Sequence, residues 1–416
     1  LGDRRQRQMC IRDRKKEVVL MQDHNGISKS IDPDLVRIMA IICGATVANL
    51  YYNQPLLGEL SREFNVSVRN IGLVSTLTQI GYGMGMFFII PLGDILERKN
   101  MILKLLLASV ISLILFASSK NLNWLIVSSF LVGFTTVIPQ LVVPFAAELS
   151  APRERGKVLG TVLSGLLAGI LLARTISGFL GALLGWRSVY YIASILMIVL
   201  YVVVSKSFPK NEPKLIESYK NIMISLKDLV KNEPLLREAS LSGAMMFGAF
   251  SIFWTTLIFF LESPIYNMGS EAAGLFALLG ISGVIAAPII GRLSDKKSAK
   301  FAVGVSIFFA VMGFIVLFIF GNRIAGLILG LILLDLGTQS GQVSNQTLVH
   351  SLSPEARNRL NTVFMVAYFT GGALGSFAGT YSWNLYGWKG VCTAGLAFLT
   401  VAVINLSLIH ISEPTR

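Results

Sequence analysis

The chain has 416 residues, of which 53% are hydrophobic and 14% charged, and its mean hydropathy is +0.66. This composition excludes an ordinary soluble domain and indicates a polytopic membrane protein. The formal net charge is +13, but the basic residues gather in short segments between apolar runs, as membrane loops do, so nucleic acid is not an expected partner.

The two ends of the chain differ in character from the rest. Residues 4–14 and 406–416 resemble translated sequencing-adapter DNA, so neither stretch contributes to the expected function. We treat residues 1–30 as an N-terminal tail in which Met21 is the candidate start. The first apolar segment is too long for a cleavable signal peptide and lacks a small-residue cleavage site.

Twelve segments are long and apolar enough to cross a bilayer, which takes about 20 residues per helix. They are residues 35–57, 71–92, 101–118, 123–147, 158–182, 187–205, 238–261, 272–291, 301–320, 323–348, 360–382 and 388–407. Asp32 and Pro33 supply an N-cap acceptor and a proline for the start of the first helix. Backbone groups in lipid must be satisfied within each segment, so the sequence predicts an all-α membrane protein with twelve transmembrane helices.

Several of these helices carry polar or aromatic side chains that are unusual in lipid. On the first helix they recur along one face, and Gln140 in the fourth helix matches Gln342 in the tenth at an offset of 202 residues. The residues expected to line a central cavity from helices one, four and seven are Thr46, Asn49, Tyr51, Asn53, Gln140 and Trp254. Hydrogen bonding between helices is the alternative role for each of them.

Arg174 is the basic residue that lies deep in a predicted span. It is about sixteen residues into the fifth helix, or about 24 Å from the start of that helix. A cation at this depth is expected to be paired or to bind an anionic or polyhydroxyl group. A structural arginine bonded to carbonyl groups is the alternative, and pairing with Asp335 is left open.

The segment 206–237 is the one long polar connection, and it divides the chain into six helices on each side. We expect an N-terminal bundle over residues 31–205 and a C-terminal bundle over residues 238–405. Loops on the side of this linker hold nineteen Lys and Arg residues against six on the other side. The positive-inside rule then places the linker and both termini in the cytoplasm and the multi-pass protein in the plasma (inner) membrane.

Asp335 lies within an apolar run, residues 326–346, where a carboxylate is costly. It is about 18 Å deep in a hydrocarbon core of about 30 Å, and burial there disfavours its charged form. The residues that share or adjoin its helix face are Gln339, Gln342, Asn345 and Gln346, which we expect to line the cavity. A proton-coupling or substrate-binding role for Asp335 is weighed against a structural one.

The two halves of the sequence repeat each other. The matched landmarks are Asp94 with Asp295 at an offset of 201, and Pro152, Arg155 and Gly185-Trp186-Arg187 with Pro354, Arg357 and Gly387-Trp388-Lys389 at 202. A duplicated six-helix unit is typical of secondary transporters, whose substrate site lies near the midplane where the halves meet. The sequence therefore predicts two pseudo-symmetric six-helix bundles.

The loop PLGDILERK, residues 91–99, is similar to the cytoplasmic signature G-x-L-A-D-R-x-G-R-R/K of the major facilitator superfamily, with Asp94, Arg98 and Lys99 at matching places. A second copy, GRLSDK at residues 291–296, keeps the first glycine and the aspartate. The resemblance covers residues 31–405 and implies the major facilitator fold.

Three segments resemble the branch of that superfamily that contains sugar, nucleoside and drug efflux antiporters. They are ATVANLYYNQPLL at 45–57, LLARTISG at 171–178 and LLDLGTQ at 333–339. The resemblance implies export of a small organic solute in exchange for protons by alternating access. The chain departs from the drug antiporters in having no arginine within residues 123–147 and no proline in the glycine motif of helix five.

A set of charged residues lies at the basic ends of the helices, where the resemblance implies a gating role. Its members are Asp94, Arg98, Lys99, Glu148, Arg155, Asp295 and Arg357. Opposite charges there can hold the halves together in one state and release them in another. The alternative is that they only determine topology. Small residues at four-residue spacing, Gly165 and Gly169 among them, permit close helix contact.

Rival functions find little support in the sequence. No G-x-x-x-x-G-K-[ST] pattern occurs, and His24 and His350 are the histidines outside the terminal segments that could serve an intramembrane enzyme. Of the cysteines, Cys10, Cys43 and Cys392, two lie in apolar runs, and no metal site or cofactor is expected. We expect a monomer whose partners are a small-molecule substrate, protons and the bilayer; a proton symporter or facilitator for uptake is the alternative.

Overall fold

The computed structural model describes residues 31–151, 153–211, 218–282, 298–353 and 356–412. Within these ranges ten helices are long and apolar enough to cross a membrane. They are Pro33–Glu63, Val68–Gly93, Arg98–Ala117, Leu122–Leu149, Arg155–Leu184, Trp186–Ser207, Pro234–Leu261, Ala299–Phe320, Ile324–Leu352 and Arg357–Ser407. The second part of the predicted span 272–291, from residue 283 on, lies outside the described residues, and its first part contains a short helix, α13 (Ser270–Leu278).

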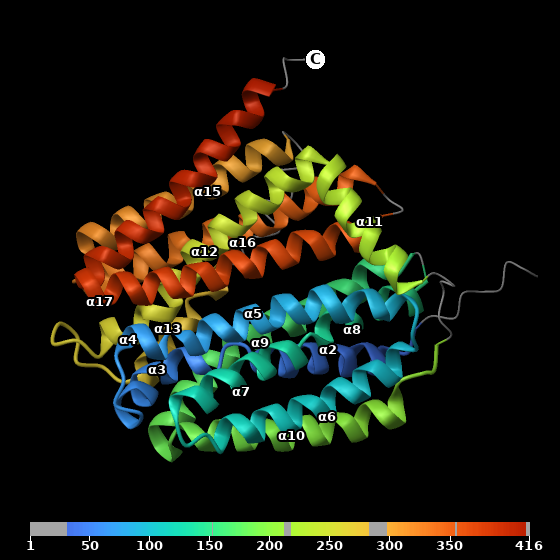
Figure 1. Cartoon of the computed structure of the whole chain (residues 1–416), viewed down its shortest axis with the longest axis horizontal. Coiled ribbons are helices and arrows are strands. Elements are labelled where there is room, and N and C mark those ends of the chain that lie inside the picture. Colours follow the sequence, from blue (N-terminus) through green and yellow to red (C-terminus); the bar gives the residue numbers. More distant parts are fainter. Residues whose placement is uncertain (1–30, 152, 212–217, 283–297, 354–355, 413–416) are drawn as a thin grey trace, which may run out of the picture.

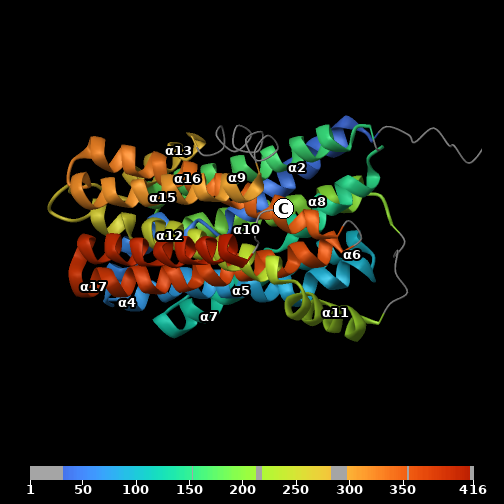
Figure 2. The ribbon, with the colours of Figure 1, turned by 90° about the horizontal axis from the view of Figure 1, so that it is seen from above.

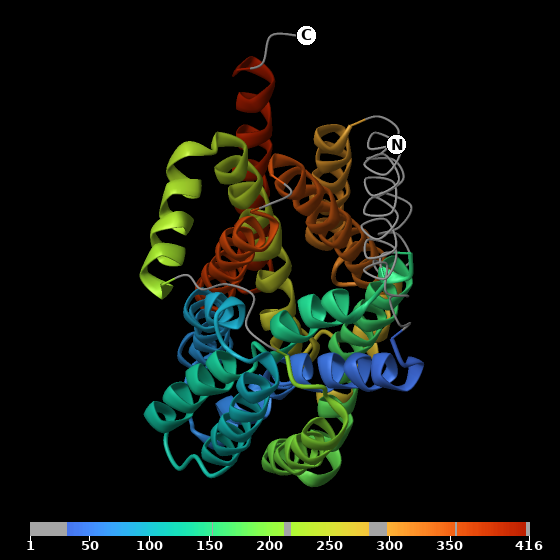
Figure 3. The same ribbon diagram turned by 90° about the vertical axis from the view of Figure 1, so that its right-hand side faces the viewer.

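The helices of the first half pack together, as do those of the second. In Figure 3 the blue-to-green helices fill the lower part of the molecule and the orange-to-red helices the upper part. The first half contains α2 (Pro33–Ala48), α3 (Asn53–Glu63), α4 (Val68–Ile71), α5 (Leu73–Ile89), η1 (Ile90–Asp94), α6 (Arg98–Ala117), α7 (Leu122–Thr135), α8 (Ile138–Leu149), α9 (Arg155–Leu184) and α10 (Trp186–Ser207). After the linker helix α11 (Tyr219–Asn232) come α12 (Pro234–Leu261), α13, α15 (Ala299–Phe320), α16 (Ile324–Leu352) and α17 (Arg357–Ser412).

The start of the first span follows the sequence signal. Asp32 accepts a hydrogen bond from the backbone N–H of Asp34 at 3.0 Å, and Pro33 occupies the first helical turn. The predicted cap is thereby confirmed.

Two predicted spans are broken near their middles rather than continuous. The first is interrupted by a turn at residues 49–52 between α2 and α3, and the fourth is interrupted at residues 136–137 between α7 and α8. Pro139 in the first turn of α8 has no N–H to continue the ladder of α7, which accounts for the second break. Tyr51 and Gln140 adjoin these breaks, so irregular backbone helps to position two candidate site residues.

The run α17 is two helices that fold back on each other at Gly387 (Figure 2). Gly387 has a φ of 57°, and Gly185, its counterpart in the first half, has a φ of 78°. Both values lie in the left-handed region that glycine adopts at little cost. The repeated Gly-Trp pair therefore marks the same kind of turn before the last helix of each half.

Small residues allow close helix contact inside each half. A methyl group added at Gly169 on α9 would lie 2.2 Å from the Gly44 carbonyl oxygen on α2. In the second half, a methyl at Gly375 on α17 would lie 2.1 Å from the Gly248 carbonyl oxygen on α12. Contact between the halves runs mainly through α5 with α17 and α9 with α13.

Candidate functional site

A cavity of about 460 Å³ lies between the two halves and reaches the surface at one end of the molecule. We call this end, which carries α11 and η1, the linker end, and the opposite one the far end. Gly93 and the exposed Asn358 line the mouth of the cavity, together with Ile222 and Leu226 of α11. Solute would therefore enter or leave this conformation from the linker end.

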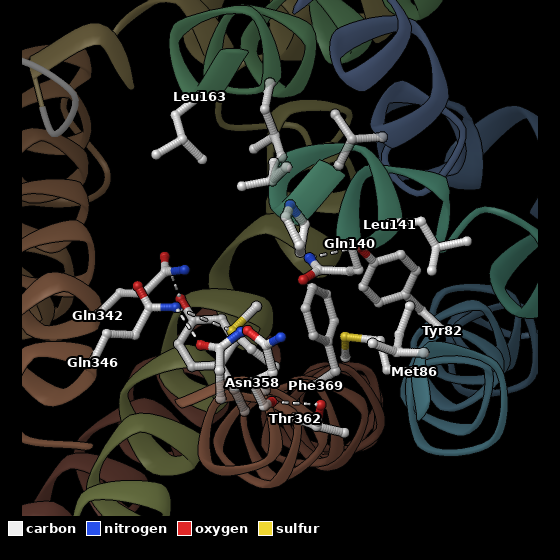
Figure 4. Close-up of a pocket in the computed structure, with 18 of the residues that line it drawn as sticks. Tyr82, Met86, Gln140, Leu141, Leu163, Gln342, Gln346, Asn358, Thr362 and Phe369 are labelled. Atoms are coloured by element: carbon white, nitrogen blue, oxygen red, sulfur yellow. Dashed lines mark hydrogen bonds between the residues drawn. The ribbon is translucent and has the colours of Figure 1, made fainter. Parts of the chain in front are cut away.

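Amide side chains from both halves face the cavity. Gln140 on α8 donates to the hydroxyl of Tyr82 at 3.2 Å. Opposite it, Gln342 on α16 accepts from the hydroxyl of Tyr368 at 3.2 Å. Figure 4 shows Gln342 on one side of the cavity and Gln140 with Tyr82 on the other.

Another pair of amide side chains and a pair of aromatic rings also line the cavity. Gln346 donates to the side-chain oxygen of Asn361 at 3.2 Å. The ring centres of Tyr82 and Phe369, which come from different halves, are 4.5 Å apart. Apart from Arg98 and Arg359, the cavity presents neutral donors, acceptors and ring faces, which suit an uncharged or weakly charged polar solute with a ring or an apolar face.

Arg174 lies just beyond the wall of the cavity and is 2% exposed. Its Nε donates to Gln54 at 2.6 Å. Its guanidinium carbon lies 4.5 Å from the ring centre of Tyr51, which lines the cavity, and 4.3 Å from that of Trp254. Its Nη2 has no hydrogen-bond partner among the described residues. Aromatic faces and one amide thus compensate a buried cation that retains an unused donor.

Asp335 on α16 is also 2% exposed, and both of its carboxylate oxygens lack a hydrogen-bond partner within the described ranges. A methyl added at Gly280 would lie 2.9 Å from its Oδ2, so the carboxylate rests against the Gly280 backbone. Arg174 is near enough to attract it electrostatically. Among the described ion pairs none joins Arg174 to Asp335. The two charges therefore lie near each other without direct contact.

Five of the residues expected in the cavity do line it: Tyr51, Gln140, Gln339, Gln342 and Gln346. The other five do not, and this corrects the expectation from the sequence. Thr46 donates to the Ile42 carbonyl of its own helix at 2.6 Å, and Asn49 faces the sulfur of Met197.

The remaining three residues that do not line the cavity, Asn53, Asn345 and Trp254, contact other protein groups. Asn53 accepts from Ser75 at 2.6 Å and so ties α3 to α5. Asn345 donates to the Gly341 carbonyl at 2.8 Å on its own helix. Trp254 packs on Arg174 behind the cavity wall, and its indole N–H lies close enough to the Asp335 carboxylate to interact with it, though outside hydrogen-bond geometry.

The far end is closed by contacts between the halves. Arg62 donates to Glu262 at 2.6 Å, and deeper in the molecule the Gln79 amide donates to Ser376 at 2.7 Å. Thr175 on α9 donates to the Gly274 carbonyl on α13 at 2.8 Å. The described residues thus show one open end and one closed end.

The predicted gating residues lie at the linker end, where those that are described bond within their own half. Arg98 forms an ion pair with Glu148 at 2.6 Å and donates to the Gly93 carbonyl at 3.1 Å. The other bonds run from Lys99 to the Phe208 carbonyl at 2.6 Å, from Arg155 to that of Ala147 at 3.1 Å and from Arg357 to that of His350 at 3.4 Å. Asp295 and the side chain of Asp94 fall outside the described residues.

Some site residues were absent from the sequence-based set. Tyr82 and Tyr368 hold the cavity amides, and Arg62 and Glu262 close the far end. A hydroxyl group inside an apolar span was a weak indication that Tyr82 has a polar role. Its hydrogen-bond partner, Gln140, cannot be predicted from the sequence. No cluster of His, Cys, Asp and Glu side chains that could hold a metal ion occurs among the described residues.

Known proteins are similar to this chain over most of its length. The family model described as Major Facilitator Superfamily matches residues 39–376. The chain is 36% identical over 376 residues to an Escherichia coli protein named "Uncharacterized transporter YgaY", which covers 90% of this chain and 95% of that one. It is 23% identical over 384 residues to a Helicobacter pylori protein named "Probable sugar efflux transporter", with 91% and 96% covered.

Solved structures of transporters are similar in fold. A bacterial homologue of the human lysosomal transporter Spinster, inward-facing and occupied, superposes with a TM-score of 0.72 at 14% identity over 90% of this chain and 95% of that one. The nucleoside transporter NupG gives a TM-score of 0.72 at 15% identity, with 91% and 99% covered. At these identities the likeness concerns the fold alone.

Proposed function

Because this chain belongs to the Major Facilitator Superfamily, we propose that it exports a small organic solute in exchange for protons by alternating access. Membership makes it a membrane transporter of a solute and sets it apart from enzymes, since its relatives are named as transporters. The direction, the coupling ion and the class of solute are the parts that we propose.

The observation that carries the proposal is the pair of buried charges beside the cavity. Asp335 and Arg174 come from different halves, are each 2% exposed, and keep unused hydrogen-bonding capacity among the described residues. An ionised carboxylate without partners in a dry interior is costly, so uptake of a proton relieves that cost. A group that binds a proton in one state and releases it in another is what proton coupling requires.

The lining of the cavity supports an uncharged or weakly charged solute. Gln140 and Gln342 present amides from opposite walls, and Phe369 and Tyr82 present ring faces. Such a surface fits sugars, nucleosides and amphiphilic drugs. The names of the Helicobacter relative and of the nucleoside transporter fall within the same range of solutes.

The orientation that we propose is compatible with export, and the relative named as a sugar efflux transporter supports that direction. The positive-inside rule assigns the linker end to the cytoplasm, so the open cavity faces inward and loads solute from the cell. Opening of the far end then releases solute outside, with proton uptake on that side. Both termini are cytoplasmic in this scheme, and the protein resides in the plasma (inner) membrane.

The test uses everted membrane vesicles from a strain that lacks its own exporters. A susceptibility panel of drugs and metabolites in that strain first identifies a transported solute. Acidification of the vesicle interior should then drive its accumulation, and Asp335→Asn should abolish this dependence while Asp34→Asn, at an exposed site, should not. Accumulation with the opposite pH dependence would indicate a symporter, and unchanged proton dependence in Asp335→Asn would remove that residue from coupling.

A further inference from the structure

The linker helix α11 lies across the linker end rather than along the spans (Figures 1 and 3). The hydroxyl of Tyr219 donates to the Phe88 carbonyl at 3.1 Å, and Phe88 lies near the end of the span Val68–Gly93. Arg237 donates to the carbonyls of Val230 and Lys231 at 2.9 and 2.7 Å, which fixes the other end of the helix. These bonds hold α11 beside the end of that span.

One face of α11 belongs to the protein interior. Ile222 and Leu226, four residues apart, are buried and line the mouth of the cavity. Leu229 packs against the same core from the next turn. The position of α11 therefore affects the opening of the cavity.

A second face carries all three lysines of the helix. Lys220, Lys227 and Lys231 are exposed, and their spacing of seven and four residues puts them on one stripe, since each residue advances by about 100°. Ile224 and Val230 flank this lysine stripe and are 47% and 41% exposed. Cations bordered by exposed apolar side chains are characteristic of a helix that lies in the headgroup region of a membrane.

A third face is polar and carries no cation. Asn221, Asp228 and Asn232 repeat the same spacing one residue later, and all three are exposed. They form a polar stripe about 100° around the helix from the lysine stripe. The helix thus has three distinct faces: a buried apolar face, the lysine stripe and the polar stripe.

We propose that the lysine stripe of α11 binds the anionic headgroups of the surrounding bilayer. Clusters of lysines beside a transmembrane helix are attracted to anionic lipid, and the flanking Ile224 and Val230 add apolar contact below the headgroups. Ile222 and Leu226, on another face of the same helix, line the mouth of the cavity. Lipid that binds the lysine stripe and holds α11 in place therefore also stabilises this wall of the mouth.

The test measures the depth of α11 in vesicles and needs no transported solute. A nitroxide is placed by Ile224→Cys or, for comparison, by Asn221→Cys in the full chain with Cys10→Ser; Cys43 and Cys392 are buried. Power-saturation EPR compares collisions with oxygen and with a water-soluble nickel chelate. Vesicles of phosphatidylcholine alone are compared with vesicles that also contain phosphatidylglycerol.

Anionic vesicles should shift the label at position 224 toward oxygen, and high salt should reverse that shift because it screens the headgroup charge. The label at position 221 should stay accessible to nickel in both kinds of vesicle. Equal nickel accessibility at position 224 in the two kinds of vesicle would overturn the proposal. The result does not depend on the direction or the coupling of transport, so it can fail while the proposed function stands.

The chain offers a matched variant, since each lysine of the stripe is followed by a residue of the polar stripe. The rotated variant exchanges the three pairs: Lys220→Asn with Asn221→Lys, Lys227→Asp with Asp228→Lys, and Lys231→Asn with Asn232→Lys. Composition and net charge stay the same, but the stripe moves around the helix by about 100°. Ile224 lies between the two stripes, about 40° from one and about 60° from the other, so the variant should weaken the lipid-dependent shift at position 224 without abolishing it.

A second variant, with all three lysines changed to glutamine, keeps the polar stripe intact and should lose the shift. Retention of the full shift in the glutamine variant would overturn the proposal.

Discussion

The guanidinium carbon of Arg174 lies 4.3 Å from the ring centre of Trp254, so a buried cation of the first half rests on an aromatic ring of the second. Tyr51 contributes another ring face at 4.5 Å. A desolvated contact of this kind is worth about 2 kcal/mol. Because it joins the two halves beside the cavity, it must be remade whenever the halves rock against each other.

Trp254→Leu should destabilise the conformation described here, because it removes the ring face and leaves the charge of Arg174 less compensated. We expect a loss of at least about 2 kcal/mol, because the cation–π contact and the packing of the buried indole on Phe250 and Phe253 are both lost. The loss is seen as a lower midpoint of thermal unfolding in detergent by circular dichroism. Trp254→Phe keeps a ring and should lose less. Trp124→Leu, at a site that is 38% exposed on α7, is the control; equal midpoints for all three variants would contradict this account of Arg174.

Breaking the Arg62–Glu262 ion pair should favour opening of the far end. The two side chains meet at 2.6 Å with 64% and 21% of their surface exposed, so the pair contributes at most about 1 kcal/mol, or a factor of about five in population. Nitroxides at Asn70→Cys and Ile265→Cys, in exposed segments of the two halves, report the separation by double electron–electron resonance. Glu262→Gln should enrich the longer distances.

The charge exchange Arg62→Glu with Glu262→Arg is the matched control for that experiment. It restores an attraction between the halves and should return the shorter distances. If Glu262→Gln leaves the distance distribution as it is in the native chain, the ion pair plays no part in holding the far end closed.

The depth of Asp335 and Arg174 could be predicted because each interrupts a long apolar run, and both side chains are buried in the structure. The predicted tenth span, residues 323–348, differs from α16 (Ile324–Leu352) by one residue at its start and four at its end. Hydrophobic periodicity and length carry this information. They say which residues are deep but not what each one touches.

Thr46 illustrates why the lining of the cavity was harder to predict. A hydroxyl on an apolar helix can face a wet cavity or bond its own backbone, and Thr46 does the latter. Tyr82 and Tyr368, which bond Gln140 and Gln342, come from other helices. The sequence pattern around each glutamine therefore does not predict its partner. The break before Gln140 had a signal in Pro139, whereas the pairing of Arg62 with Glu262 depends on how the halves pack.

Gly375→Ala should destabilise the second half strongly. The added methyl would lie 2.1 Å from the carbonyl oxygen of Gly248, so α17 and α12 must move apart along their contact. Overpacking of this kind costs about 1–3 kcal/mol. Thermal unfolding in detergent measures the loss, and Gly160→Ala, where a methyl would meet nothing within 4 Å, is the matched change. A midpoint for Gly375→Ala at or above that of Gly160→Ala would show that this helix contact is not tight.

Gln79→Met should favour opening of the far end at a deeper point of the closure. The Gln79 amide donates across the halves to Ser376 at 2.7 Å, and both side chains are buried. Ser251 of the second half also donates to the Gln79 side-chain oxygen, at 3.5 Å, so the change removes two bonds between the halves, each worth about 0.5–1.5 kcal/mol. Ser376 keeps a second partner in Thr255 at 2.9 Å. The spin pair at positions 70 and 265 should gain longer distances, and more so when Glu262→Gln is added, since separate contacts add. The control is Thr370→Val, which removes a hydroxyl that bonds within α17 itself and should leave the distances unchanged. If Thr370→Val lengthens the distances as much as Gln79→Met does, the effect of Gln79→Met cannot be assigned to hydrogen bonding between the halves.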